Sequence, residues 1–290
     1  MDVSIIIVNY NTKELISNCI ASIISQTSKL IYEIIVVDNA STDGSQDFFN
    51  DRYTDVKFIE LPKNIGFGGA NNVGFEHSVG EYLFFLNSDT ILLNNAIRFF
   101  HDFMIKNKGE KIGCLGALLM DEKLNINGYG GAFPNLKNHF KSYFTLLNSK
   151  HDTSINLHSP FDVDYVLGAD MFIPAKVFSN VGAFDPKYFM YYEESDLQLR
   201  IDTLGYSRKV IPEPKIIHLE GRSLNHSIKK MLIVRESAFR FFKKNRPTIE
   251  YFSFRVLSFL TSFLLLFKSA YSFKDFLIYL GSSFNKINLR

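Results

Sequence analysis

The stretch YLFFLNSDT, residues 82–90, places a fully apolar run directly before a polar tip. The run has the length and composition of a strand that is buried on both faces. Asn87, Ser88 and Asp89 follow at once. An Asp at such a place often caps a helix, but a helical pattern begins only at residue 94. One carboxylate is also sufficient for a hard cation whose other ligands come from a diphosphate and water. The stretch therefore predicts a buried strand that ends in a candidate metal ligand.

Similar apolar runs recur through the first 120 residues and alternate with helical patterns. The strand-like runs are residues 3–10, 33–38, 56–61, 82–87 and 114–120, and the helical patterns are residues 12–26, 45–52 and 94–107. This alternation indicates an α/β fold with a Rossmann-like, mostly parallel central sheet that is flanked by helices. Ligands of such sheets collect at the carboxyl ends of the strands. Residues 121–162 show no clear period and are predicted to form surface loops.

Length and composition fit one large domain with an appendage. The chain has 290 residues, of which 46% are hydrophobic, and this is enough for a complete core. Cys19 and Cys114 lie in apolar periodic segments. We expect them to be reduced packing residues of a cytoplasmic protein. The N-terminus lacks the basic start and the long apolar core of a signal peptide.

Charge divides the chain into an acidic and a basic part. Residues 1–228 carry 20 Lys and Arg against 27 Asp and Glu, whereas residues 229–290 carry 12 against 3. No nucleic-acid-binding motif accompanies the basic end, so nucleic acid is not predicted as a partner. The apolar segment 256–267 is shorter than the roughly 20 residues that span a bilayer. We predict a C-terminal helical extension that lies on an anionic membrane surface. Packing on the rest of the chain or in a homodimer is the alternative.

Polar segments also follow the second and third strands. Asp38 ends the second strand, where it either caps the turn NASTDGS or accepts hydrogen bonds from a base or a ribose. NIGFGGANNVG, residues 64–74, follows the third. Its glycines would let backbone N–H groups approach a phosphate or a sugar, and a flexible loop is the alternative. A dinucleotide-binding fingerprint would follow the first strand, where NYN stands instead, so a dehydrogenase is not expected.

Three acids crowd the first turn of a helix predicted within residues 190–206: Glu193, Glu194 and Asp196. The apolar stripe of this helix runs to Leu204. Acids are favoured at a helix N-terminus by the macrodipole. Mutual repulsion and burial beside the aromatic residues 189–192 can also raise a carboxyl pKa into the range of a general base. His218 ends the apolar segment 209–218, as either a packing residue or a ligand.

In their order, these segments resemble the inverting glycosyltransferases of family 2, in particular the branch with bacterial rhamnosyltransferases and other enzymes of cell-surface polysaccharides. The segments are SIIIVNYN, IIVVDNASTDGS, NIGFGGANNVGF, YLFFLNSDT, VLGADMFIP, VGAFDPKYFMYYEESDLQLR and IIH, within residues 3–222. Each is weak alone, but the ordered set is specific. The resemblance implies a GT-A catalytic domain over residues 1–228. Its donor-binding half would occupy about residues 1–120 and its acceptor half about 121–228, with the helical extension at 229–290.

The resemblance also implies roles on the donor side. The residues expected to contact the nucleotide sugar are Asn9, Asn11, Asp38, Asn64, Gly66, Asn71, Asn87 and Ser88. Asp89 matches the last residue of the Asp-X-Asp motif and would be the principal ligand of Mn²⁺ or Mg²⁺. Asn87 stands at the first position of that motif, which departs from the strict pattern. His218 matches the position that can supply a second protein ligand.

On the acceptor side, Glu194 matches the catalytic base. Glu193 and Asp196 would tune this base or position the acceptor, and Asp170 would line the acceptor site. The implied reaction moves a sugar from a UDP- or dTDP-sugar, with dTDP-rhamnose among the candidates, to a hydroxyl of a growing, lipid-linked cell-surface glycan. The enzyme would be cytoplasmic and peripheral on the inner face of the cell membrane. The alternative is a catalytically silent protein of the same fold that binds nucleotide sugars or carbohydrate.

Overall fold

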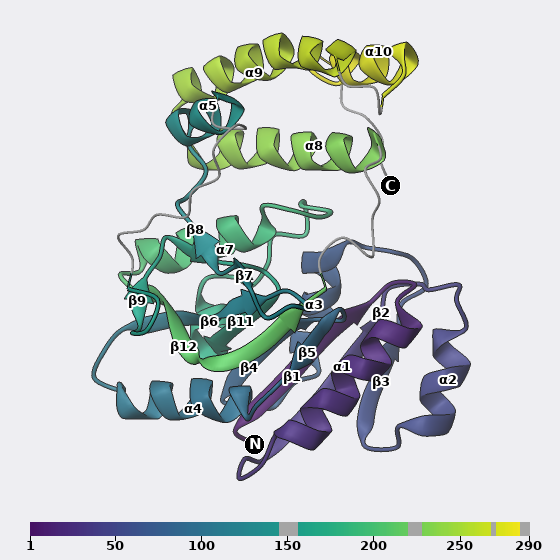
Figure 1. The fold of residues 1–290 in the computed structure, drawn as a ribbon, viewed down its shortest axis with the longest axis vertical. Helices are drawn as coiled ribbons and strands as arrows, with labels where there is room; N and C mark the ends of the chain where they lie inside the picture. Colours follow the sequence, from purple (N-terminus) through teal and green to yellow (C-terminus); the bar gives the residue numbers. More distant parts are fainter. Residues whose placement is uncertain (145–155, 220–227, 268–270, 285–290) are drawn as a thin grey trace.

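A computed structural model describes residues 1–144, 156–219, 228–267 and 271–284 (Figure 1). The strands are β1 Val3–Asn9, β2 Tyr32–Asp38, β3 Val56–Glu60, β4 Tyr82–Asn87, β5 Thr90–Leu92, β6 Ile112–Met120, β7 Ile126–Gly128, β8 Gly130–Gly131, β9 Phe161–Asp162, β10 Tyr165–Val166, β11 Asp170–Pro174 and β12 Ser207–His218. The helices are α1 Lys13–Gln26, α2 Ser45–Arg52, α3 Phe67–Glu76, α4 Ala96–Lys106, α5 Leu136–Phe144, α6 Ala175–Asn180, α7 Glu193–Thr203, α8 Ile228–Asn245, α9 Thr248–Ser262 with the 3₁₀ turn η1 Phe263–Phe267, and α10 Phe273–Gly281.

The central sheet has the strand order β3-β2-β1-β4-β11-β6-β12-β5. The first four strands in this order are parallel, so their carboxyl ends lie at one edge. The register places Asn9 beside Asp38 and Val8 beside Asn87. β11 runs antiparallel between β4 and β6, which makes the sheet mixed. The α/β class is confirmed, and the polar strand tips meet at one edge as expected.

Helices cover both faces of the sheet, because alternate residues of each strand point to opposite sides. One core contains Ile5 together with buried residues of α1, α2 and α4. The other contains Ile6 together with buried residues of α3, α6 and α7. Cys19 and Cys114 are buried free thiols in these two cores. Burial raises the pKa of Cys19 to about 12, so this thiol stays protonated, as expected of a packing residue.

Two sequence expectations differ from the structure. Residues 121–162, predicted to be loops, contain β7, β8 and α5, and β9 begins at Phe161. Most of these elements have only two or three residues, too few to show a period. α5 packs on α9, where the His139 and Phe254 ring centroids are 4.7 Å apart. Leu204, expected on the apolar stripe of α7, follows the last residue of that helix and is exposed.

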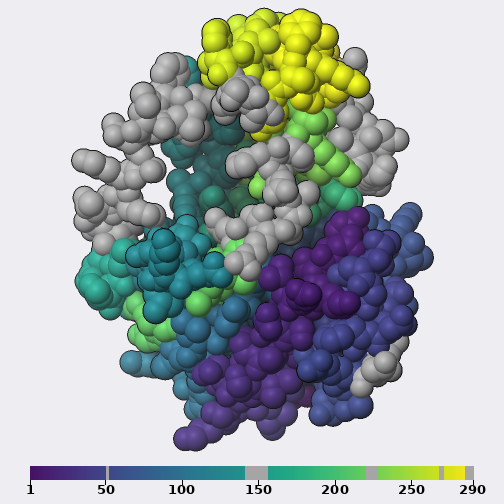
Figure 2. Space-filling model, turned by 45° about the vertical axis from the view of Figure 1, so that its right-hand side comes forward, coloured from purple at the N-terminus to yellow at the C-terminus, as the bar shows by residue number. Residues whose placement is uncertain are grey.

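The C-terminal helices form a separate layer beside α7 (Figures 1 and 2). In the space-filling view, the yellow residues of α9 and α10 cap one end of the molecule. Phe241 and Phe242 of α8 are buried against Tyr188 and Phe254. The Phe242 and Phe254 rings stack with centroids 4.0 Å apart. One face of α9 is therefore packed on protein, which the sequence left as an alternative.

The apolar helix is longer than the sequence suggested. α9 continues into η1, so the helical segment Thr248–Phe267 has 20 residues. By length and composition it could cross a membrane, whereas the predicted apolar segment 256–267 seemed too short. Length and composition do not distinguish a spanning helix from one that is packed on protein, and only 22% of its most apolar part is buried.

Candidate active site

The tips of β1 and β2 are joined through buried side chains. Asn9 Nδ2 donates to Asp38 Oδ1 over 2.7 Å and to Ser41 Oγ over 3.1 Å. The Ser41 backbone N–H donates to Asp38 Oδ2 over 2.9 Å. Asn9 and Asp38 are both fully buried. Asp38 thus holds the turn after β2, and a base or a ribose would have to use its remaining lone pairs.

The tip of β4 joins this network through Thr12. Thr12 Oγ1 donates to Asn9 Oδ1 over 2.7 Å and lies 3.0 Å from Ser88 Oγ. Thr12 precedes α1 as its N-cap residue, but its side chain makes no cap hydrogen bond. Asn11 has a left-handed backbone, with φ 55°, and its Oδ1 accepts from the Thr42 N–H over 2.7 Å. Asn9, Asn11 and Ser88 therefore lie together at the carboxyl ends of β1 and β4.

The glycine-rich loop contacts the segment before α7. Gly66 has φ +85°, and a Cβ there would lie 2.2 Å from the Phe189 carbonyl oxygen. The Phe67 N–H donates to the same oxygen over 2.9 Å. Asn64 Oδ1 accepts from the Gly66 N–H over 2.9 Å. In this structure Gly66 allows close approach of protein backbone, whereas the sequence analysis expected a sugar or a phosphate there. Asn71 is buried, and its amide donates to the Phe67 carbonyl inside α3, so it does not face a donor directly.

Gly66→Ala should destabilise the protein by more than the positive φ alone costs, because the new methyl group meets the Phe189 carbonyl. We expect a loss of about 1–3 kcal/mol in the free energy of unfolding beyond the cost of the positive φ, measured by urea titration. Gly182→Ala is the matched control, since Gly182 has φ +81° with open space around it. Equal losses in the two variants would show that the contact with Phe189 relaxes without cost.

The two candidate metal ligands come together through β12. This strand pairs antiparallel with β5 and places His218 opposite Thr90. His218 Nε2 lies 3.4 Å from Asp89 Oδ1 and 3.4 Å from Asn87 Nδ2. His218 thus lies at the tip of β4. The sequence left it as either a packing residue or a ligand, and this position favours a ligand.

The side chains of Asp89 and His218 provide ligand atoms that fit a hard divalent cation. Within the described residues, no group of three or more His, Cys, Asp or Glu side chains is positioned to hold a metal. One carboxylate and one imidazole, from Asp89 and His218, leave positions that diphosphate oxygens and water can fill. Such a site would bind its metal together with the nucleotide-diphosphate.

Two carboxyl groups at the start of α7 have raised pKa values. Glu193 is 4% exposed, and burial, followed by the charge of Glu194, raises its pKa to about 8. Burial also raises the pKa of the half-buried Glu194. A Cβ on Gly168 would lie 3.5 Å from the Glu194 Cβ. The next residue, Ala169, accepts a hydrogen bond from the Asn87 N–H over 2.9 Å. The acidic pair thus borders the same edge as the metal candidates.

The backbone before these acids is strained. Tyr191 and Tyr192 have φ 70° and 68°, which is a left-handed conformation that costs bulky residues about 1–2 kcal/mol each. α8 supports this turn, because Ser237 Oγ donates to the Met190 carbonyl over 2.7 Å. The Tyr192 and Phe241 ring centroids are 5.7 Å apart. Such strain persists where the surroundings fix it, often at functional sites. No local pattern in the sequence predicts this strain.

Asp196 does not face Glu194. Its carboxylate is fully buried and accepts from Arg200 Nε over 3.0 Å, Lys244 Nζ over 2.9 Å and Asn245 Nδ2 over 2.9 Å. Helix residues two positions apart point about 200° away from each other, so Asp196 lies on the other side of α7 from Glu194. The expectation that it tunes the base or touches the acceptor is corrected. It joins α7 to α8.

Asp170 lies inside the sheet rather than on an acceptor surface. It is fully buried between β4 and β6, and its Oδ2 accepts from the Ala117 N–H over 2.6 Å. Its Oδ1 has no hydrogen-bond partner in the described part of the chain. Burial raises the pKa of this carboxyl well above its usual range. A fully buried acid cannot touch an acceptor in this conformation, so the expected role is corrected.

Sequence reasoning missed two amide contacts that shape the site. Asn72 donates to the Phe184 carbonyl over 2.8 Å and accepts from the Phe184 N–H over 3.0 Å, which ties α3 to the segment before α7. Gln198 makes the same pair of bonds to the Val166 backbone, over 2.9 and 2.8 Å. The Asn-Asn pair in the glycine-rich segment could have signalled the first, whereas Gln198 carries no local signal.

The fold and the polar strand tips together define the class of protein. The crystal structure of GalNAc-T7 with UDP, GalNAc and Mn²⁺ has a TM-score of 0.58 with this chain at 17% identity, and the match covers 83% of this chain and 50% of that one. Structural neighbours of this kind are GT-A glycosyltransferases, so the predicted GT-A type is confirmed.

Residues 4–111 match the model of glycosyl transferase family 2. These residues thus form a glycosyl transferase family 2 domain, and the resemblance seen in the sequence is confirmed.

Two relatives illustrate the match. A poly(ribitol-phosphate) beta-glucosyltransferase of Bacillus spizizenii is 36% identical over 135 residues, which are 45% of this chain but 20% of that protein. The chain thus spans about a fifth of that relative. An N-acetylglucosaminyl-diphospho-decaprenol L-rhamnosyltransferase of Mycobacterium tuberculosis is 22% identical over 237 residues, which are 76% of each chain.

Proposed function

We propose that this chain is a metal-dependent, inverting glycosyltransferase. It moves a sugar from a UDP- or dTDP-sugar, with dTDP-rhamnose among the candidates, to a hydroxyl of a growing, lipid-linked cell-surface glycan. The observation that carries the proposal is the distance of 3.4 Å between Asp89 and His218, at the edge that Glu194 also borders. A metal-bound diphosphate and a general base on one edge are what a single displacement requires.

On the donor side, the exposed Asn11 contacts the nucleotide, and the fully buried Asn9 and Asp38 hold the turn beside it. Asp89 and His218 would hold Mn²⁺ or Mg²⁺, and the cation would supply positive charge against the diphosphate leaving group. Asn87 and Ser88 lie beside these ligands and orient the diphosphate. Asn64 and Gly66 act indirectly, since they fix the loop against the segment before α7.

On the acceptor side, Glu194 accepts the proton of the attacking hydroxyl. Its pKa is raised by burial, which makes the carboxylate a stronger base than an exposed glutamate. Burial and the charge of Glu194 also raise the pKa of Glu193, which disfavours two negative charges on this pair of neighbours. Attack by the hydroxyl opposite the leaving group inverts the anomeric carbon.

The proposed acceptor is lipid-linked, and the enzyme works at the cytoplasmic face of the membrane. The name of the mycobacterial relative contains a substrate of this kind, a sugar on diphospho-decaprenol. The large apolar residues that are exposed on the C-terminal layer also support it; on α9 and η1 they are Ile249, Phe252, Val256, Leu260, Phe263, Leu264, Leu266 and Phe267. A homodimer through the same face is the alternative.

The test is consumption of nucleotide sugars by the full chain. A panel of UDP- and dTDP-sugars, with Mn²⁺ or Mg²⁺, should show metal-dependent release of nucleotide from one donor, and a chelator should stop it. Nucleotide release can be followed by chromatography. Tight nucleotide binding without release from any donor, even with a lipid-linked acceptor present, would favour the catalytically silent binding protein.

A further inference from the structure

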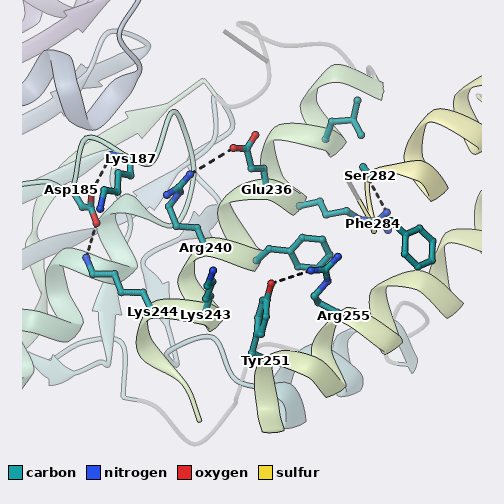
Figure 3. A pocket seen from close by; sticks show the side chains of 13 residues that line it. Asp185, Lys187, Glu236, Arg240, Lys243, Lys244, Tyr251, Arg255, Ser282 and Phe284 are labelled. Atoms are coloured by element: carbon teal, nitrogen blue, oxygen red, sulfur yellow. Dashed lines mark hydrogen bonds and ion pairs between the residues drawn. The ribbon is translucent and has the colours of Figure 1, made fainter. Parts of the chain in front are cut away.

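A basic cavity lies between α8, α9, the end of α10 and the turn at residues 185–187 (Figure 3). Its volume is about 610 Å³. Two of its lining residues, Asp185 and Glu236, are acids. The basic lining residues are Lys187, Arg235, Arg240, Lys243, Lys244 and Arg255. The cavity therefore carries a net positive charge that suits an anion.

Only some of this charge is neutralised by protein groups. Lys244 is paired with Asp185 over 2.8 Å and also with Asp196. Arg240 faces Glu236 at 3.7 Å, as the dashed line in Figure 3 marks. In the part of the chain that the structure describes, Lys187 and Lys243 form no ion pair. These two lysines are available to a ligand.

An exposed apolar face borders the cavity. Tyr251 and Arg255 of α9 line it. The adjacent row on the same helix is Phe252, Val256 and Leu260, which are 57%, 58% and 58% exposed. Phe284, also exposed, lies at the rim. An anionic group on an apolar chain would satisfy both surfaces at once, with the charge in the cavity and the chain along the helix.

We propose that this cavity binds the phosphate of an anionic phospholipid of the bilayer. Lysines near a membrane attract such headgroups. The lipid-linked acceptor is a less suitable occupant, because Lys244 reaches the face of α7 that carries Asp196, about 200° from Glu194. The inference deepens the proposed function and rests on it only in placing the chain at a membrane. Lys244 also contacts Asp196 of α7, so a bound headgroup would restrict the motion of the helix that carries Glu194.

The experiment is co-sedimentation of the full chain with phosphatidylcholine vesicles that contain phosphatidylglycerol. Lys243→Gln should weaken binding about fivefold, since a lysine near an anionic surface contributes about 1 kcal/mol. Lys187→Gln with Lys243→Gln should weaken it about 25-fold. Lys274→Gln is the matched control, because Lys274 is exposed on α10 in the same layer but does not line the cavity. It should weaken binding clearly less than Lys243→Gln does, because its side chain does not line the cavity that holds the headgroup.

Two outcomes would overturn the proposal. Equal losses for Lys243→Gln and Lys274→Gln would indicate a diffuse charged face rather than a site. A loss seen only with neutral vesicles that carry a polyprenyl diphosphate would assign the cavity to the acceptor lipid. Binding of UDP and dTDP with Mn²⁺, measured on the same variants by calorimetry, should stay at the wild-type level. Failure of the vesicle test thus leaves the proposed function standing, and thermal unfolding of each variant verifies its fold.

Discussion

Glu194→Gln should lower the rate of sugar transfer by about 10²–10⁴-fold and leave donor binding intact. The amide keeps the size and the hydrogen bonding of the side chain but cannot accept the proton of the acceptor hydroxyl. Donor binding depends on the strand tips and the metal ligands, which this change does not touch. Steady-state transfer and calorimetric titration with UDP or dTDP measure the two effects separately.

Two further variants sharpen this test. Glu194→Asp keeps a carboxylate at a greater distance, so its transfer rate should lie between those of the wild type and Glu194→Gln. Because the base acts as a carboxylate and burial raises the Glu194 pKa, the wild-type rate should rise with pH through a value above that of an ordinary glutamate, about 4.3. Near-normal turnover of Glu194→Gln, with a large loss in Glu193→Gln, would move the base to Glu193.

Asp89→Ala should reduce the metal-dependent affinity for UDP or dTDP by about 100-fold or more, since changes outside the ligand shell alone cost about 10–100-fold. The fold should survive, because the side chain lies at a strand tip beside His218 rather than in either core. Calorimetry with and without Mn²⁺ measures this loss.

The control for Asp89→Ala is Asp55→Ala. This change removes an exposed carboxylate before β3, at the amino end of the parallel strands and so away from the site. It should bind nucleotide as the wild type does. His218→Ala should weaken the metal dependence without removing it, since Asp89 would remain as a ligand. Unchanged metal-dependent affinity in Asp89→Ala would mean that the tip after β4 is only a turn.

The donor half of the fold could be predicted because its signals are local. Each buried strand is a continuous apolar run, and parallel pairing then brings Asn9, Asp38 and Asn87 to one edge. The family's motifs follow the same order along the chain. The position of the polar strand tips therefore follows from the local strand patterns and from the parallel arrangement of the sheet.

The remaining features depend on contacts between distant residues. β11 enters the sheet antiparallel beside β4, and this pairing buries Asp170, which has no local signal. Asp196 looks like one of three similar acids in sequence, yet Lys244, 48 residues later, fixes it on the other side of the helix. α5 does have an apolar stripe, but the stripe covers only nine residues, and the helix packs on the distant α9.

The contact between Gly66 and Phe189 has a consequence for how this protein can vary. It is made by a carbonyl oxygen and by backbone atoms, so no side chain at position 189 contributes to it. The side chain at position 189 can therefore change while the backbone contact between the glycine-rich loop and the segment before α7 persists. Of the two residues in this contact, only residue 66 is restricted in sequence, because it has to stay glycine.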